Sequence, residues 1–142
     1  MRALLDVNVL IALLDAAHVH HRAAGEWLAA NVAHGWASCP LTQNGCLRIL
    51  SQPRYPNAVP LAEAAARLGE ASRHASHQFW PDEISLLDVG TARWDRLLSG
   101  NLLTDAYLLA LAVRRGGRLV TFDRAVPLAA IPGATPEHLL SL

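Results

Sequence analysis

Apolar and polar residues alternate near the N-terminus in blocks that suit a short strand followed by helices. Ala3–Leu5 is an apolar run of strand length, and the apolar residues of 9–14 recur at helical spacing, with Asn8 as the expected N-cap. A second amphipathic stretch covers residues 20–32 and predicts another helix. The chain is therefore expected to begin with a strand and two helices.

The middle of the chain repeats this alternation. Residues 36–39, directly before Pro40, predict a buried strand that leads into a helix near Thr42. Prolines concentrate between residues 52 and 60 and indicate a loop, and the alanine-rich residues 61–74 have strong helix propensity.

The second half of the chain contains one well-marked helix and one well-marked strand. Thr104 is the expected cap of a helix that continues to Arg115 and ends at Gly116 and Gly117, and residues 118–122 have the pattern of a central strand. The weaker signals predict a short strand within 77–87, a helix over 91–98 and one strand within 129–142.

Strands that alternate with helices predict an α/β fold with a doubly wound, mainly parallel sheet flanked by helices on both faces. The 142 residues are expected to form a single domain, 1–142. A chain of this size buries roughly two thirds of its unfolded surface, so it needs neither disulfides nor structural zinc.

Composition narrows the classes of function. Twelve basic and twelve acidic side chains give no net charge, which excludes binding of a polyanion by bulk charge. All twelve basic residues are arginines, so a P-loop ATPase and a Schiff-base enzyme are excluded as well. Cys39 and Cys46 fit neither a disulfide framework nor a metal motif, and we expect a reducing, cytoplasmic location. The apolar residues 7–14 are far short of the roughly 20 needed to span a membrane.

Three aspartates are the candidate chemical groups. Asp6 follows the first strand and Asp123 follows residues 119–122, so both are expected at the carboxyl edge of a parallel sheet, where such sheets bind ligands. Asp105 opens a helix on the side that the helix must bury. At about 5 Å each pair of carboxylates would repel by roughly 3 kcal/mol, and a divalent cation reverses that sign.

Oxygen ligands favour Mg²⁺ or Mn²⁺ over zinc, and three aspartates with open coordination positions suit phosphodiester hydrolysis. Each aspartate also has a structural interpretation. Asp105 suits a helix N-terminus electrostatically, and an aspartate after a strand is a common turn residue, as at Asp6 and Asp123. The spacing alone leaves both interpretations open.

Three segments in this order, residues 4–10, 103–112 and 119–124, resemble the PIN-domain family, most closely its VapC-type toxin branch. The resemblance implies a PIN-like fold and a Mg²⁺- or Mn²⁺-dependent endoribonuclease with Asp6, Asp105 and Asp123 at its site. It also implies an RNA substrate, a homodimer, and inhibition by a small cognate antitoxin, as in a type II toxin–antitoxin pair.

One position departs from the family pattern. The family usually has a glutamate on the helix after the second strand, and that spacing falls here on Gly45. A second metal ion is therefore in doubt, and Gln43 or Asn44 is the candidate for a neutral oxygen ligand. Thr121 shares a strand face with Asp123 and is expected to support a metal-bound water or to orient a carboxylate. Arg124 is the candidate phosphate contact.

Other groups are given structural interpretations. The histidines of 18–21 do not share one helical face, so we expect a solvated helix start and not a metal site. The four tryptophans are expected to be core and interface anchors. An aspartyl phosphotransferase is disfavoured because the chain has no lysine and has Asn8 where such enzymes need a second aspartate. The remaining alternative is a degenerate PIN-like module that binds a partner protein or RNA without cleaving it.

Overall fold

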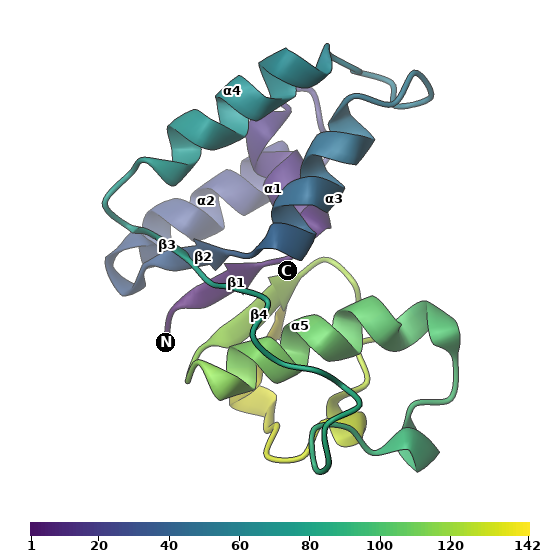
Figure 1. The fold of residues 1–142 in the computed structure, drawn as a ribbon. Helices are drawn as coiled ribbons and strands as arrows, with labels where there is room; N and C mark the ends of the chain where they lie inside the picture. The colour runs from purple at the N-terminus through teal and green to yellow at the C-terminus, as the bar shows by residue number, and fades with distance from the viewer.

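A five-stranded, entirely parallel sheet runs through the computed structural model, which describes residues 1–142 (Figure 1). The strand order is β3-β2-β1-β4-β5, so the chain winds outward from β1 in one direction and then from β4 in the other. The predicted doubly wound α/β fold is confirmed. The strands are β1 (Ala3–Leu5), β2 (Trp36–Ser38), β3 (His77–Phe79), β4 (Arg118–Thr121) and β5 (Leu139–Ser141). The helices are α1 (Val7–Leu14), α2 (His21–Asn31), α3 (Pro40–Leu50), α4 (Leu61–Ser72) and α5 (Leu103–Arg114).

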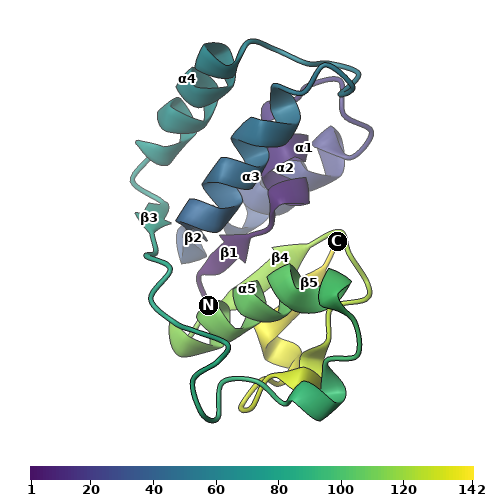
Figure 2. The same ribbon diagram turned by 45° about the vertical axis from the view of Figure 1, so that its right-hand side comes forward.

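Helices cover both faces of the sheet, and the strands send alternate side chains to each face. Leu4 and Leu119 belong to a core cluster formed with α5. Leu5 and Val120 belong to a second cluster formed with α1, α2, α3 and α4. Figures 1 and 2 show these four helices on one side of the sheet and α5 on the other.

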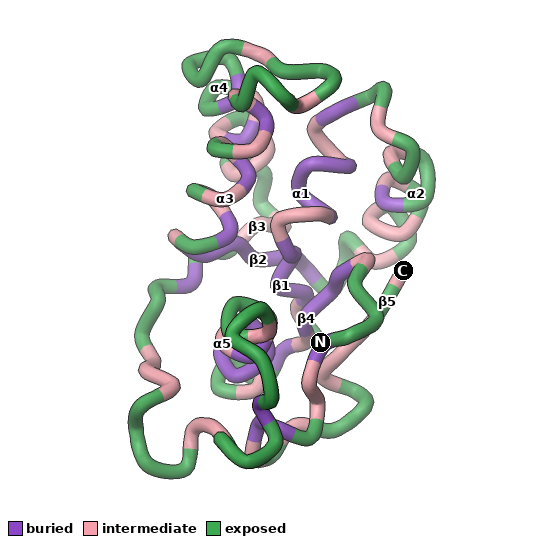
Figure 3. The backbone as a smooth tube through the Cα atoms, turned by 90° about the vertical axis from the view of Figure 1, so that its right-hand side faces the viewer, coloured by how far each residue is buried: buried purple, intermediate pink, exposed green.

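Burial follows this layering. Figure 3 shows buried residues along β1, β2 and β4, whereas the long connections are mostly exposed. No helix is both long enough and apolar enough to cross a membrane.

The predicted helix over 91–98 is wrong. That segment contains one short 3₁₀ turn, Trp94–Arg96, within an irregular connection. Leu98 is 85% exposed, and Leu97 is the buried anchor. The N–H of Arg93 donates to the carbonyl of Ala130 at 2.7 Å, so the segment is held by a contact to a distant part of the chain and not by a helical ladder.

Two predicted helix caps are also wrong. Asp6, and not Asn8, caps α1, because its Oδ1 accepts the N–H of Val7 at 2.7 Å. α5 begins at Leu103 after a 3₁₀ turn, which places Thr104 inside the helix. The C-terminal end of α5 is as predicted, since Gly116 adopts a φ of 64° that favours glycine.

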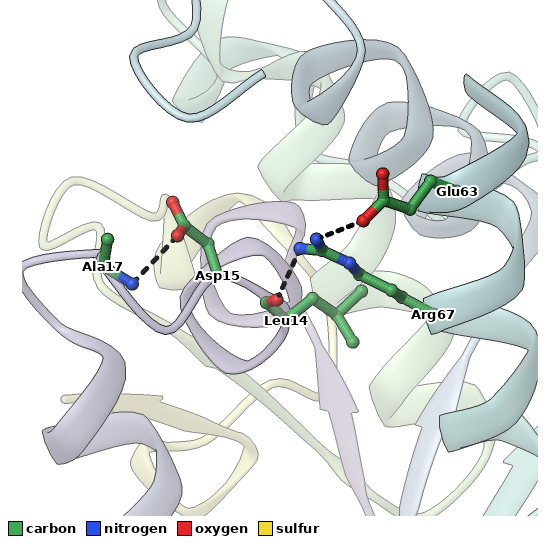
Figure 4. A network of polar contacts seen from close by, with 5 residues as sticks. All are labelled: Leu14, Asp15, Ala17, Glu63 and Arg67. Carbon is green, nitrogen blue, oxygen red and sulfur yellow. Dashed lines mark hydrogen bonds and ion pairs between the residues drawn. The ribbon is translucent and has the colours of Figure 1, made fainter. Parts of the chain in front are cut away.

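The end of α1 is fixed by polar contacts to later parts of the chain. Asp15 is buried and accepts hydrogen bonds from the hydroxyl of Tyr55, from Asn57 Nδ2 at 3.0 Å and from the N–H of Ala17 at 3.0 Å. Figure 4 shows the neighbouring contact, in which Arg67 of α4 binds the Leu14 carbonyl and pairs with Glu63. The connection before α4 and α4 itself are thereby tied to α1.

Candidate active site at the carboxyl edge of β1 and β4

The point where the winding direction of the sheet reverses lies between β1 and β4, and open α/β sheets bind ligands at the carboxyl ends of such strands. Leu5 of β1 pairs with Val120 of β4, and the N–H of Asp6 donates to the Val120 carbonyl at 3.0 Å. Asp6 and Thr121 are therefore neighbours across the two strands. Both lie one residue beyond that pair, which directs their side chains toward the α5 face.

The buried hydroxyl of Thr121 uses its full hydrogen-bonding capacity at this edge. It donates to Asp6 Oδ2 at 2.6 Å, and it accepts from Asn8 Nδ2 at 3.1 Å and from the N–H of Asp123 at 3.0 Å. The expected contact between Thr121 and a carboxylate is therefore present, and the carboxylate is that of Asp6.

Asn8 is the residue of this edge that sequence reasoning missed. Its amide nitrogen donates to Thr121, and its Oδ1 accepts the N–H of Phe122 at 3.2 Å. α1 therefore holds the end of β4 through one side chain. A signal was available, because Asn8 is the one polar residue in the otherwise apolar sequence of α1.

The three aspartates act on one another electrostatically. Burial raises the pKa of Asp6, hydrogen bonds from Thr121 and Val7 oppose the rise, and the charge of Asp123 adds to it. Burial, followed by the charges of Asp6 and Asp123, raises the pKa of Asp105 to about 6. The Asp105 carboxylate has no hydrogen-bond donor, and none of the three forms an ion pair. A cation is the partner that this set of oxygens would favour.

The side chains do not form a compact ligand group by themselves. No three His, Cys, Asp or Glu side chains gather closely enough to hold a metal ion. The metal site thus stays a prediction, supported by the shared edge, the absence of competing cations and the oxygen chemistry of the donors.

The other predicted site residues have different environments. Gln43 donates to Ser38 Oγ at 3.0 Å, and Gln43 and Asn44 line a groove of about 240 Å³ with residues of α4. Neither side chain hydrogen-bonds to an aspartate of the site. Arg124 is exposed and forms no ion pair.

Gly45 is fixed by packing against α1. A Cβ on Gly45 would come within 2.7 Å of Val7 Cγ2, so this position cannot accept a side chain unless Val7 moves. The missing glutamate of the family pattern is thus accompanied by a close approach of α3 to α1.

A family model described as the PIN domain matches residues 3–132. The chain belongs to the PIN-domain family. This PIN domain is 51% identical to Ribonuclease VapC44 of Mycobacterium tuberculosis over 142 residues, the full length of both proteins. It is also 42% identical to Ribonuclease VapC38 of the same species over 142 residues, which cover 99% of each chain. These relatives place it in the VapC branch.

Solved structures share the fold of this PIN domain. The VapBC2 structure from Rickettsia felis, bound to a DNA fragment from its promoter, superposes with a TM-score of 0.62 at 12% identity and covers 100% of this chain and 99% of that one. Mycobacterium tuberculosis VapC20, described as a sarcin-ricin loop cleaving toxin, gives a TM-score of 0.60 at 18% identity and covers 94% and 99%. At these identities the likeness shows the fold alone.

Proposed function

We propose that this PIN domain is a divalent-metal-dependent endoribonuclease, the toxin of a type II toxin–antitoxin pair, and that Asp6, Asp105 and Asp123 hold Mg²⁺ or Mn²⁺. The ribonuclease assignment is supported by relatives of that name, 51% identical over the full length. The observation that carries the residue assignment is the shared carboxyl edge: β1 and β4 pair side by side, Asp6 and Asp123 follow them, and the charges of both act on Asp105.

The chain's own residues have distinct tasks in this proposal. Asp6 is held by Thr121 and by the N–H of Val7, so its orientation is set before any ligand binds. Asp105 retains both oxygens for a cation, and Asp123, whose Oδ1 accepts the N–H of Ala125 at 2.8 Å, retains Oδ2. A bound divalent ion would screen the phosphate charge and promote ionisation of an attacking water.

The test is RNA cleavage by the purified protein, with and without added Mg²⁺ or Mn²⁺. Cleavage should require the metal, stop in EDTA and be lost in Asp6→Asn and Asp123→Asn. Asp95→Asn is the matched control, because Asp95 is an exposed aspartate in the irregular 3₁₀ turn. Full activity of Asp6→Asn, or activity undiminished by EDTA, refutes the proposal.

The second candidate is a PIN-like module that binds a partner protein or RNA without cleaving it. Gly45 at the position of the usual glutamate and the lack of a compact three-ligand group favour this alternative. Calorimetric titration with Mn²⁺ separates the two functions. A nuclease should bind the ion at a specific site that Asp105→Asn weakens, whereas a non-cleaving module should show no specific binding at millimolar metal.

The proposal includes a homodimer, a cognate antitoxin as partner, and a location in the cytoplasm. Several large apolar side chains are exposed, among them Leu87, Val89 and Leu98, which suits contacts to a second copy of the chain or to a cognate antitoxin. Light scattering of the isolated chain tests the homodimer. Cys39 and Cys46 are both free and buried, as expected for a protein of the cytoplasm.

A further inference from the structure

Phe122 directly follows β4, at the carboxyl edge of β1 and β4 where Asp6 and Asp123 lie, called the acidic edge from here on. It lies between Thr121 and Asp123 in sequence, and its N–H donates to Asn8 Oδ1 at 3.2 Å. Because Asn8 also binds Thr121, the backbone that carries the Phe122 ring belongs to the same hydrogen-bonded unit as Asp6.

An exposed imidazole stacks on this ring. The ring centroids of His20 and Phe122 are 4.5 Å apart, and their planes differ by 20°. His18 flanks His20 with centroids 5.7 Å apart and a tilt of 44°. Residues from the α1–α2 connection and from the end of β4 thus form a series of three aromatic rings that starts at Phe122, the residue before Asp123 in the sequence.

The imidazole of His20 is available to contact a ligand. His20 is exposed, and its ring takes part in no hydrogen bond. The neighbouring His21, in contrast, contacts the Ala12 carbonyl through Nδ1 at 2.7 Å. The N–H of His20 donates to His18 Nδ1 at 3.0 Å, which fixes the connection locally. The solvated helix start that the sequence predicts therefore also presents an ordered aromatic pair.

We propose that His20, supported by Phe122 and flanked by His18, is a stacking platform for an unpaired nucleobase of RNA next to the phosphodiester that is cleaved. Unstacked RNA bases are commonly held on aromatic side chains, including histidine. Phe122 directly precedes Asp123 in sequence, and its ring packs on the side of the sheet covered by α1–α4, so a base stacked on His20 would lie at the end of β4, the strand that leads to Asp123. This inference rests on the proposed nuclease function, which supplies the substrate class and the reacting edge.

The experiment measures binding of labelled single-stranded RNA of about 12 nucleotides. This length lies within the roughly 4–16 nucleotides that one single-strand-binding domain of other proteins covers. It is performed in an Asp105→Asn background so that cleavage does not interfere. His20→Ala should weaken binding about tenfold, as expected for the loss of one stacked base. His20→Phe should bind as the parent does. His34→Ala is the matched control, because His34 is an exposed histidine that precedes β2 at the opposite edge of the sheet.

An abasic RNA of the same length separates stacking from a phosphate contact. It should bind the parent and His20→Ala equally. In addition, 2-aminopurine placed at successive positions should be quenched at one position by the parent and not by His20→Ala. The platform is refuted if His20→Ala binds base-bearing RNA as the parent does, or if His20→Phe binds it as weakly as His20→Ala. It is also refuted if His20→Ala weakens the binding of abasic RNA as much as it weakens the binding of base-bearing RNA.

The two proposals fail separately. Metal-dependent cleavage without any effect of His20 on RNA binding refutes only the platform. Absence of metal-dependent cleavage refutes the nuclease, and the RNA-binding comparison still decides whether His20 contacts a base.

Discussion

Thr121 donates its hydroxyl hydrogen to Asp6 at 2.6 Å, although 115 positions separate the two residues in the sequence. The contact lies where β1 and β4 end side by side, and it is buried. A carboxylate removed from water needs such a donor to stay ionised, because burial otherwise favours its protonated form. Thr121 is thus a positioning residue of the acidic edge.

Replacing Thr121 with valine tests the role of the hydroxyl, because valine keeps the shape of the side chain and removes only its hydrogen-bonding group. Thr121→Val leaves a buried Asp6 oxygen and the Asn8 amide without this partner, so we expect the free energy of unfolding to fall by about 1–3 kcal/mol and RNA cleavage to slow. Urea denaturation measures the first effect. Thr121→Ser keeps the hydroxyl and should retain most of the activity. Equal losses in the two variants would show that the methyl group, and not the hydrogen bond, matters.

Ionisation of Asp105 should lower the free energy of unfolding. Its folded-state pKa of about 6 lies above the ordinary value of 3.8, so the folded protein binds this proton more tightly than the unfolded chain. The resulting stabilisation is complete below about pH 4 and is lost as the pH rises through about 6. Without divalent metal at about pH 8, Asp105→Asn should therefore be more stable than the parent by about 1 kcal/mol, a value reduced for solvent screening.

Thermal unfolding in EDTA over this pH range measures the Asp105 effect. The difference between Asp105→Asn and the parent should vanish near pH 4. Added Mg²⁺ should raise the unfolding midpoint of the parent more than that of the variant, because a ligand of the folded state stabilises it. Asp95→Asn should behave as the parent at every pH. A less stable Asp105→Asn at about pH 8 would contradict the predicted repulsion.

Gly45 should resist a substitution that another helical glycine accepts. Gly45→Ala places a Cβ within 2.7 Å of Val7 Cγ2, and we expect a loss of about 1–3 kcal/mol in spite of the better helix propensity of alanine. Gly69→Ala in α4 is the matched control, because its nearest neighbour is an Arg73 nitrogen at 3.9 Å. That variant should gain roughly 0.5–1 kcal/mol.

The cause of the Gly45 effect can be isolated by a double variant. Val7→Ala removes the clashing methyl groups, so Gly45→Ala should cost less in that background than in the parent. The four proteins of the cycle are compared by urea denaturation. If the losses in the free energy of unfolding caused by Gly45→Ala and Val7→Ala are additive, the destabilisation by Gly45→Ala does not arise from its contact with Val7.

The central elements were predictable because their signals are local. Ala3–Leu5 is an apolar run of strand length, residues 118–122 have β-branched and apolar residues after Arg118, and parallel pairing then places Asp6 and Asp123 at one edge. The error over 91–98 has a different origin. That segment has apolar residues at helical spacing, but a backbone contact between Arg93 and Ala130 decides its conformation.

The polar connections of the site could not be predicted in the same way. The contact between Asn8 and Thr121 depends on a register between segments 113 positions apart. The stack of His20 on Phe122 depends on where the α1–α2 connection lies, and residue spacing does not encode that position. The close approach of Gly45 to Val7 likewise appears only when α3 is packed on α1.

Asp15 should make the protein sensitive to acid. Its burial raises the pKa of the carboxyl, but hydrogen bonds from Tyr55, Asn57 and Ala17 outweigh burial and hold the pKa below 3.8. The ionised form is therefore favoured by folding. Its stabilising contribution is present above the ordinary pKa and is lost as the pH falls through the lower folded-state value.

Tyr55→Phe should weaken this contribution by removing the hydroxyl that donates to Asp15 Oδ2. We expect a loss of about 1.5 kcal/mol near pH 7, and the difference from the parent should shrink toward about pH 2, as acid protonates Asp15. Urea denaturation at both pH values measures it, with Asp15→Asn as the variant that removes the charge. If Tyr55→Phe stays equally destabilised in acid, the Tyr55 hydroxyl acts through packing at the end of α1 and not through the charge of Asp15.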